Sequence, residues 1–388
     1  SSLTFRVSYS LTGTPPDASY CNALTKLSMN TPYRPTTTDK ELGFVVAALG
    51  NDELTYEKKH EFNFGVDAGF FNNRLNVTFD VYQRRNFDEI APTVTQLYGT
   101  AYANVGSMKS WGEELSISST NVKTNDFSWQ TSLIYSHNRT EITNLYNQGR
   151  VIDLVQGNGF AKQGYPARAL FSIPFVGINE KGNPVCINEK GQATVGDLNF
   201  QERNNTDYLI YEGSTDPIYN GSLGNTFNYK GFHLNLFLTY AFGNVVRLDP
   251  VFKAKYNDLT SMNHDFKNRW MQPGDENVTN VPGVVSRYEY EQNRTLLSTA
   301  YNAYNYTSVR TAKGDFIRLK EISLAYDFPH RWLENSPVNN ISLKLQATNL
   351  MLLYADKKLN GQDPEFMNAG GVASPMPKQF TLTLKLGL

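Results

Sequence analysis

Apolar and polar residues alternate without interruption over the last nine positions of the chain. One face of an extended strand would carry Phe380, Leu382, Leu384, Leu386 and Leu388, and the other face Thr381, Thr383, Lys385 and Gly387. Ordinary strands run about five or six residues, whereas a strand tilted by about 45° needs roughly 9–11 residues to cross a bilayer. The pattern therefore predicts a strand that crosses a membrane.

The same alternation recurs along the chain and predicts ten strands in all. In the segment 315–328 the apolar positions change parity between Leu319 and Ile322. Such a switch indicates one extra residue in the strand, so a β-bulge is expected near Lys320 or Glu321. The ten predicted strands are 2–11, 60–71, 75–83, 109–119, 127–137, 218–229, 232–242, 315–328, 341–350 and 379–388.

The connections between these strands alternate between short and long. The short ones are 72–74, 120–126, 230–231 and 330–340, and the long ones are 12–59, 84–108, 138–217, 243–314 and 351–378. Loops beyond about 12–15 residues are uncommon in compact soluble domains. Short periplasmic turns and long extracellular loops are typical of outer-membrane β-barrels. The alternation therefore favours an all-β transmembrane antiparallel barrel over a soluble β-sandwich.

Composition agrees with this fold class and excludes others. Lys+Arg number 36 and Asp+Glu 37, which gives a net charge of −1 and none of the basic excess of a nucleic-acid-binding domain. Aromatic residues reach 13%. The mean hydropathy is −0.45, which a barrel allows because its strands bury only alternate side chains in lipid.

Ten strands permit either a small independent barrel or the last part of a larger one. The long loops favour the larger barrel, and an unpaired sheet edge cannot face lipid, so something must close the sheet. The chain begins directly with strand-like sequence and no signal peptide, so we expect Ser1 not to be the original N-terminus.

Several strings in this order resemble the C-terminal part of SusC/RagA-type TonB-dependent transporters. Two of them are Arg-Trp-Met-Gln-Pro-Gly-Asp at 269–275 and Gly-Asp-Phe-Ile-Arg-Leu-Lys-Glu-Ile-Ser-Leu at 314–324. Each string alone is weak, but their order and spacing cover nearly the whole chain. The remaining strings are 54–59, 62–67, 70–75, 112–115, Tyr326 with Pro329, 347–350 and 361–365.

The resemblance implies a barrel of about 22 strands, of which residues 1–388 would supply roughly the final ten. It also implies a plug domain and a TonB-contacting segment, neither of which is found in this sequence. One position departs from the pattern, because such barrels commonly finish on an aromatic residue and this chain finishes on Leu388.

The same resemblance marks two sets of motif residues. The first is Phe316, Arg318, Leu319 and Lys320, and the second is Asp363, Pro364 and Glu365. For Arg318 and Lys320 we weigh direct substrate contact against pairing with carboxylates inside the barrel, and pairing is favoured. Three carboxylates, on Asp67, Asp80 and Glu114, are predicted to face water in the lumen.

No catalytic or metal-binding constellation is found, so we predict a protein that is not an enzyme and needs no cofactor. The five histidines, His60, His137, His233, His264 and His330, are scattered without metal-ligand spacing. Cys21 and Cys186 are predicted to lie in loops, and the sequence does not decide whether they pair.

One long loop concentrates tyrosine and asparagine. Tyrosine faces and amide groups suit sugar rings or peptide backbones, which need apolar contact together with hydrogen bonds. The alternative is that these residues pack the loop against itself or against a partner. The candidate ligand-binding residues are Tyr288, Tyr290, Tyr301, Asn302, Tyr304 and Asn305.

The resemblance implies active import across the outer membrane of a Gram-negative, Bacteroidota-like bacterium. The substrate would be an oligosaccharide or an oligopeptide, and the implied partners are a SusD-like lipoprotein, the TonB–ExbB–ExbD system, the N-terminal part of the barrel and its plug. Membrane lipid and lipopolysaccharide would contact the wall, and no nucleic acid is expected. The alternative is a scaffold barrel whose loops only dock partner proteins.

Overall fold

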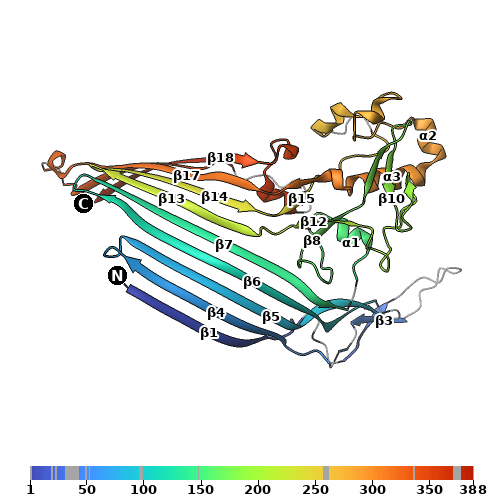
Figure 1. Cartoon of the computed structure of the whole chain (residues 1–388), viewed down its shortest axis with the longest axis horizontal. Coiled ribbons are helices and arrows are strands. Elements are labelled where there is room, and N and C mark those ends of the chain that lie inside the picture. The colour runs from blue at the N-terminus through green and yellow to red at the C-terminus, as the bar shows by residue number, and fades with distance from the viewer. Residues whose placement is uncertain are drawn as a thin grey trace.

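The computed structural model shows all ten predicted strands in one antiparallel sheet (Figure 1). It describes residues 2–18, 21, 24–30, 43–48, 50–51, 53–95, 99–146, 148–256, 262–334, 337–369 and 377–387, so Ser1 and Leu388 lie outside the described residues. Strands that are neighbours in the sheet also follow one another along the chain. They are β1 (Ser2–Thr14), β4 (Glu57–Phe70), β5 (Leu75–Thr95), β6 (Gly99–Lys123), β7 (Phe127–Leu145), β13 (Tyr219–Tyr229), β14 (Phe232–Phe242), β17 (Phe316–Asp327), β18 (Asn340–Ala355) and β19 (Gln379–Gly387).

Three strands, β5, β6 and β7, are much longer than predicted and extend into segments that were expected to be loops. The prediction stopped where apolar residues gave way to polar ones on both faces. The backbone ladder nevertheless continues there, for example with Arg85 opposite Lys109 and Lys109 opposite Glu141. Strand pairing therefore continues beyond the segment in which apolar and polar residues alternate.

The register gives the sheet an apolar face and a polar face. Side chains in facing positions fall on the same face of a sheet. One registered row of the apolar face is Phe5, Val66, Phe79 and Leu115, and another is Leu236, Ile322 and Ala347. On the polar face lie Arg6, Asp67, Asp80, Glu114, Ser136, Thr239 and Arg318, so the three predicted lumenal carboxylates share it.

The apolar face is not covered by a second sheet or a helix layer in the described part of the chain. Phe62 is 49% exposed and Leu324 46% exposed, although both lie on inner strands of the sheet. On β14 the apolar positions run from Phe232 to Phe242, about 33 Å along the strand and about 25 Å along the normal at a tilt near 40°. This height matches the apolar band of an outer-membrane barrel and argues against a soluble sandwich.

The sheet has two open edges, β1 and β19, which do not pair with each other. Backbone groups on an edge in hydrocarbon would each cost several kcal/mol. We therefore expect further strands to complete this wall, and the total of about 22 strands stays a prediction.

The predicted bulge is confirmed at Lys320. Glu321 pairs with Phe237 and Leu319 with Leu238, so Lys320 is the extra residue between two consecutive partners. On the neighbouring strand β18, Asn349 adopts φ +55°, a left-handed conformation that asparagine tolerates better than most residues. The extra residue explains the change of parity in the sequence.

The two ends of the sheet differ as the loop lengths predicted. Short turns and both termini lie at one end, and the long connections gather at the other (Figure 1). In the tightest turn, Lys230 and Gly231 have φ +42° and +89°, the left-handed backbone that a two-residue hairpin requires.

Two of the long connections fold together into a compact unit, which we call the head: residues 148–217, 243–256 and 262–315 (Figure 1). Helices in this unit were not predicted. Its elements are α1 (Val151–Val155), β8 (Ala169–Ser172), β9 (Phe175–Ile178), β10 (Pro184–Ile187), β11 (Ala193–Thr194), β12 (Ile210–Ser214), β15 (Val245–Arg247), η1 (His264–Asn268), η2 (Asp275–Asn277), α2 (Arg287–Gln292), α3 (Arg294–Asn305), η3 (Ser308–Arg310) and β16 (Thr311–Lys313).

The remaining elements lie in the other connections. They are β2 (Lys26–Asn30), β3 (Gly43–Ala48), η4 (His330–Trp332), η5 (Lys357–Leu359) and η6 (Pro364–Ala369). Among the described helices, none has the length and apolarity needed to span a bilayer.

Candidate ligand-binding head

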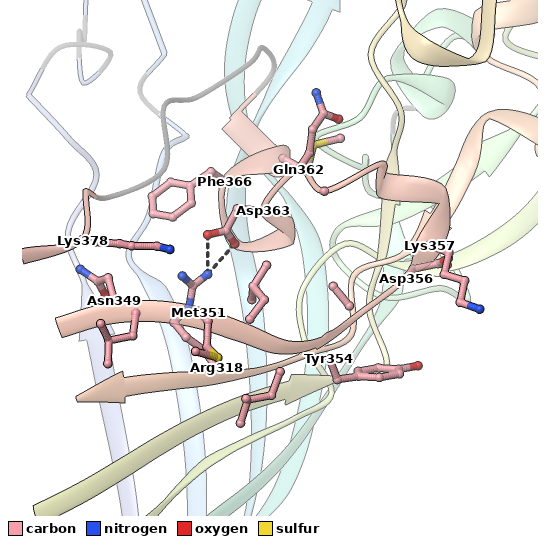
Figure 2. Close-up of a pocket in the computed structure, with 16 residues that line it drawn as sticks. Arg318, Asn349, Met351, Tyr354, Asp356, Lys357, Gln362, Asp363, Phe366 and Lys378 are labelled. Atoms are coloured by element: carbon pink, nitrogen blue, oxygen red, sulfur yellow. Dashed lines mark hydrogen bonds and ion pairs between the residues drawn. The ribbon is translucent and has the colours of Figure 1, made fainter. Parts of the chain in front are cut away.

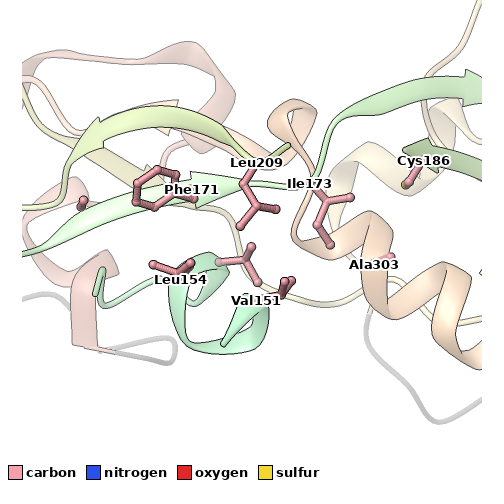
Figure 3. Close-up of a cluster of buried hydrophobic side chains, with 9 residues drawn as sticks. Val151, Leu154, Phe171, Ile173, Cys186, Leu209 and Ala303 are labelled. Carbon is pink, nitrogen blue, oxygen red and sulfur yellow. The ribbon is translucent and has the colours of Figure 1, made fainter. Parts of the chain in front are cut away.

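The head has a hydrophobic core of its own (Figure 3). The short helix α1 supplies Val151 and Leu154, β8 supplies Phe171, and Ala303 of α3 closes the cluster from the second connection. All four of these residues are at most 1% exposed. Two segments about 150 positions apart in sequence are thus joined by apolar burial, as in a soluble domain.

The guanidinium of Arg247 ties the same two connections together. It donates hydrogen bonds to the carbonyl oxygens of Phe171 (2.6 Å), Thr307 (2.8 Å) and Val155 (3.2 Å), and to the hydroxyl of Ser172 (3.0 Å). Burial lowers the pKa of Arg247 to about 10, so the group stays charged at neutral pH. Carbonyl dipoles stabilise this buried cation, to which no carboxylate of the described residues is directly bonded.

Three of the predicted ligand residues are structural. Tyr301, Tyr304 and Asn305 are 1%, 2% and 3% exposed on the inner side of α3. The hydroxyl of Tyr301 donates to the carbonyl of Gly283, and Asn305 bonds both backbone groups of Phe252. Because α3 turns these three side chains into the head, their burial favours loop packing, the alternative, over ligand contact.

The other three candidates remain accessible. Tyr288 is 77% exposed, Asn302 is exposed, and Tyr290 is half-buried with its hydroxyl 3.2 Å from that of Ser298. That hydrogen bond, followed by the nearby Arg294 side chain, lowers the pKa of Tyr290. Ligand contact by these residues stays a prediction, now limited to the outer side of α2 and α3.

The motif residue Arg318 lies on the polar face of the wall and is 4% exposed (Figure 2). Its Nη2 atom lies 2.5 Å from both carboxylate oxygens of Asp363 and 3.2 Å from Oε2 of Glu365. Phe316 is buried beside it, while Leu319 is half-buried on the apolar face. Two motifs predicted separately therefore meet, with Pro364 at the first position of η6 between the two acids.

Pairing, rather than exposure to substrate, describes Arg318. The Arg318–Asp363 contact fastens residues 356–369, which we call the clasp, to the wall. Lys320, at the bulge, forms no ion pair with any described residue.

A cavity of about 730 Å³ opens between the clasp and the C-terminal part of β18 (Figure 2). Charged groups of both signs line it together with apolar and aromatic side chains. A pocket of this size, with polar groups placed among apolar surface, is suited to part of an oligomeric ligand. The residues labelled around it include Asn349, Met351, Tyr354, Phe366 and Lys378.

The cysteines and histidines offer no reactive centre among the described residues. Cys21 and Cys186 are both free, and burial raises the pKa of Cys186 to about 12. No group of three or more His, Cys, Asp or Glu side chains in the described part of the chain is placed to hold a metal ion.

Comparison with known proteins places this architecture in a family. Residues 1–249, well over half of the 388, match the family described as TonB dependent receptor-like, beta-barrel. The chain belongs to this family.

Curated relatives support the narrower resemblance to SusC/RagA-type proteins. TonB-dependent receptor P39 of Formosa agariphila is 25% identical over 390 residues, covering 86% of this chain and 35% of that receptor. TonB-dependent receptor SusC of Bacteroides thetaiotaomicron is 25% identical over 356 residues, covering 87% of this chain and 32% of SusC. The chain thus spans about a third of the length of these relatives.

Solved structures share the fold across the whole chain. The RagAB peptide transporter aligns with a TM-score of 0.76 and 24% identity, covering 99% of this chain and 40% of that chain. The RagAB peptide importer in the 'open-open' state gives a TM-score of 0.75 and 23% identity over 100% of this chain. The predicted SusC/RagA-type barrel fold is confirmed.

Proposed function

We propose that this chain forms part of an outer-membrane transporter that imports oligosaccharides or oligopeptides in a TonB-dependent manner. The observation that carries the proposal is the joint presence of a lipid-type wall and a packed head at its loop end. A wall alone would suit any barrel. A head with its own core and an exposed Tyr288 and Asn302 supplies a surface for recognition at the extracellular end.

The partners follow from the incomplete wall. The two open edges require the rest of a barrel, and we propose that residues 1–388 supply its last ten strands out of about 22. The plug and the segment that contacts TonB–ExbB–ExbD would belong to the remaining part of the protein. A SusD-like lipoprotein would lie over the head, as the kinship with SusC and the RagAB transporter suggests.

The proposal allows two substrate classes, oligosaccharides and oligopeptides. The RagAB neighbours are described as peptide transporters and importers, which favours peptide, whereas aromatic and amide groups on the head suit sugar rings equally well. The cavity under the clasp, with Lys378 and Asp356 on its lining, suits a ligand that carries charge.

The proposal is tested by transport in the native bacterium. A strain lacking the full-length gene is compared with the wild type for accumulation of labelled oligosaccharides and oligopeptides, with and without a protonophore. We expect the deletion to abolish energy-dependent accumulation of one substrate class, and a strain lacking TonB to behave in the same way. Unchanged uptake of every substrate, together with loss of partner proteins from the cell surface, would favour the scaffold alternative instead.

A further inference from the structure

The apolar face changes to a charged one at the same level on three adjacent strands. On β5 this face runs from Val77 and Phe79 through Val81 to Gln83 and Arg85, moving away from the short turn. The neighbouring strands switch in register with it. Beyond the switch the face carries Gln83 and Arg85 on β5, Glu113, Trp111 and Lys109 on β6, and His137, Arg139 and Glu141 on β7.

We call these eight residues the belt. Some of its charged side chains form ion pairs and others do not. Lys109 pairs with Glu141 at 2.9 Å and lies over the ring of Trp111. Arg85 and Arg139 are exposed and form no ion pair with any other described residue. Two unpaired guanidinium groups beside an apolar face are suited to anionic groups at the surface of a lipid layer.

A cavity of about 360 Å³ lies beside Arg139. The edge of β7 that pairs with β13 has a different partner after Asn138. The N–H of Asn138 donates to the carbonyl of Ile218, directly before β13, at 2.9 Å. Four residues further on, the N–H of Ile142 donates to the carbonyl of Tyr165, which lies in the head. The gap between these two partners leaves room for a ligand.

The lining of this cavity suits a sugar. Trp111 and Tyr211 contribute aromatic surface, and Arg139 and Glu141 contribute hydrogen-bonding groups. Asp216 also lines it but is paired with Arg168 at 2.7 Å, which leaves Arg139 as the accessible cation. Aromatic surface beside polar groups matches a saccharide ring, and an unpaired guanidinium matches a phosphate.

We propose that this cavity and the two arginines bind the phosphorylated saccharide headgroup of a glycolipid in the outer leaflet. Its acyl chains would lie along the adjoining apolar face, over Leu115, Leu133 and Leu223. Leu133 and Leu223 face each other on β7 and β13, and Leu115 on β6 lies one row away. The inference rests on the proposed placement of the wall in the outer membrane. It concerns the outside of the wall, so it is independent of the imported substrate.

The test uses the full-length receptor, purified in detergent and freed of lipid. Binding of lipopolysaccharide is compared with binding of the same material after removal of its phosphates, and with its saccharide released from the acyl chains. The variant is Arg85→Gln/Arg139→Gln. A matched control, Lys123→Gln/Arg287→Gln, removes two exposed cations far from the belt, one at the other end of β6 and one on α2.

We expect the Arg85→Gln/Arg139→Gln variant to bind intact lipopolysaccharide about tenfold more weakly, and the control to stay within about twofold of the wild type. Removing the phosphates should weaken wild-type binding by a similar factor and abolish the difference between variants. Equal affinities for both variants would overturn the site. Tight binding of the acyl-free saccharide would also overturn it, because the cavity would then hold a soluble glycan.

Failure of this inference is distinguishable from failure of the proposed function. Binding is measured on purified protein, so a receptor that imports nothing can still show the phosphate-dependent site. Conversely, a receptor that imports its substrate but binds lipopolysaccharide equally in all variants loses only the site.

Discussion

The wall and the head bury their side chains in opposite ways. In the wall, large apolar side chains point outward and remain accessible, as Phe380 and Leu382 do at 69% each on the edge strand β19. In the head, Val155 and Ile173 are fully buried. Both regions contain similar apolar residues, so their environment, lipid or protein interior, decides the arrangement.

The comparison shows that two kinds of stability operate in one chain. The head is held by a protein core and by buried hydrogen bonds, so its stability responds to the loss of single packed groups. The wall is held by its backbone ladder and by lipid, so its stability responds to charge placed on the outward face.

The largest effect is expected for Arg247→Met. Methionine fills most of the volume but removes the guanidinium donor from the buried carbonyls of Val155, Phe171 and Thr307, of which Thr307 keeps the N–H of Arg310. We expect the head to lose about 3–5 kcal/mol, while the wall keeps its strands.

Thiol labelling measures the opening of the head. Of the two cysteines in residues 1–388, only Cys21 should react in the wild type at pH 8, because Cys186 is 1% exposed and its pKa of about 12 leaves almost no thiolate. Arg247→Met should make Cys186 react, and Arg287→Met, which alters an exposed arginine on α2, should not. If Cys186 stays protected in Arg247→Met, the head does not depend on this guanidinium.

The second effect concerns the wall. Leu236→Arg places a charge on the apolar face of β14, near the middle of its span, and should cost about 2–4 kcal/mol in a bilayer. Asn235→Arg, one residue away on the polar face, should cost less than about 1 kcal/mol because it faces water. Reversible unfolding in lipid vesicles compares the two. Equal costs would mean that the two faces are assigned wrongly.

A smaller coupling is expected between the clasp and the wall. Arg318→Met leaves Asp363 buried without a cation, whereas Arg318→Met combined with Asp363→Asn removes both charges. We expect the double variant to recover about 1–3 kcal/mol relative to the sum of the single variants. Protease sensitivity of residues 356–369 measures each step, and strictly additive effects would show that the pair does not hold the clasp.

The wall could be predicted from the sequence because a two-residue period needs no knowledge of distant contacts. Even the bulge at Lys320 was visible, since one extra residue inverts the parity of every apolar position after it. The ends of β5, β6 and β7 on the side of the long connections were not predicted. The outward residues Gln83 and Arg85 on β5 are polar, so the alternation loses its signal there although the ladder continues.

The head could not be predicted in the same way. Its core joins residues such as Leu154 and Ala303, which belong to different connections, and no local pattern indicates that they meet. Tyr301 and Tyr304 were candidate ligand residues because the composition of a loop does not reveal which way its side chains point. A helical period was available at 294–305, where Leu297, Ala300, Tyr301 and Tyr304 share one face. Applying it would have assigned both tyrosines to the core.

The smallest effect on stability is expected for Tyr288→Ala, which is also the sharpest test of what remains of the predicted ligand surface. Tyr288 is 77% exposed, so its loss should change the stability of the head by less than about 0.5 kcal/mol. Tyr301→Phe, which deletes only the buried hydroxyl bonded to Gly283, should cost about 1 kcal/mol. If the outer side of α2 binds substrate, Tyr288→Ala weakens substrate binding and Tyr301→Phe does not. Titration of the purified receptor with the imported substrate separates the two. A Tyr288→Ala receptor with unchanged affinity would move recognition away from this helix and toward the cavity under the clasp.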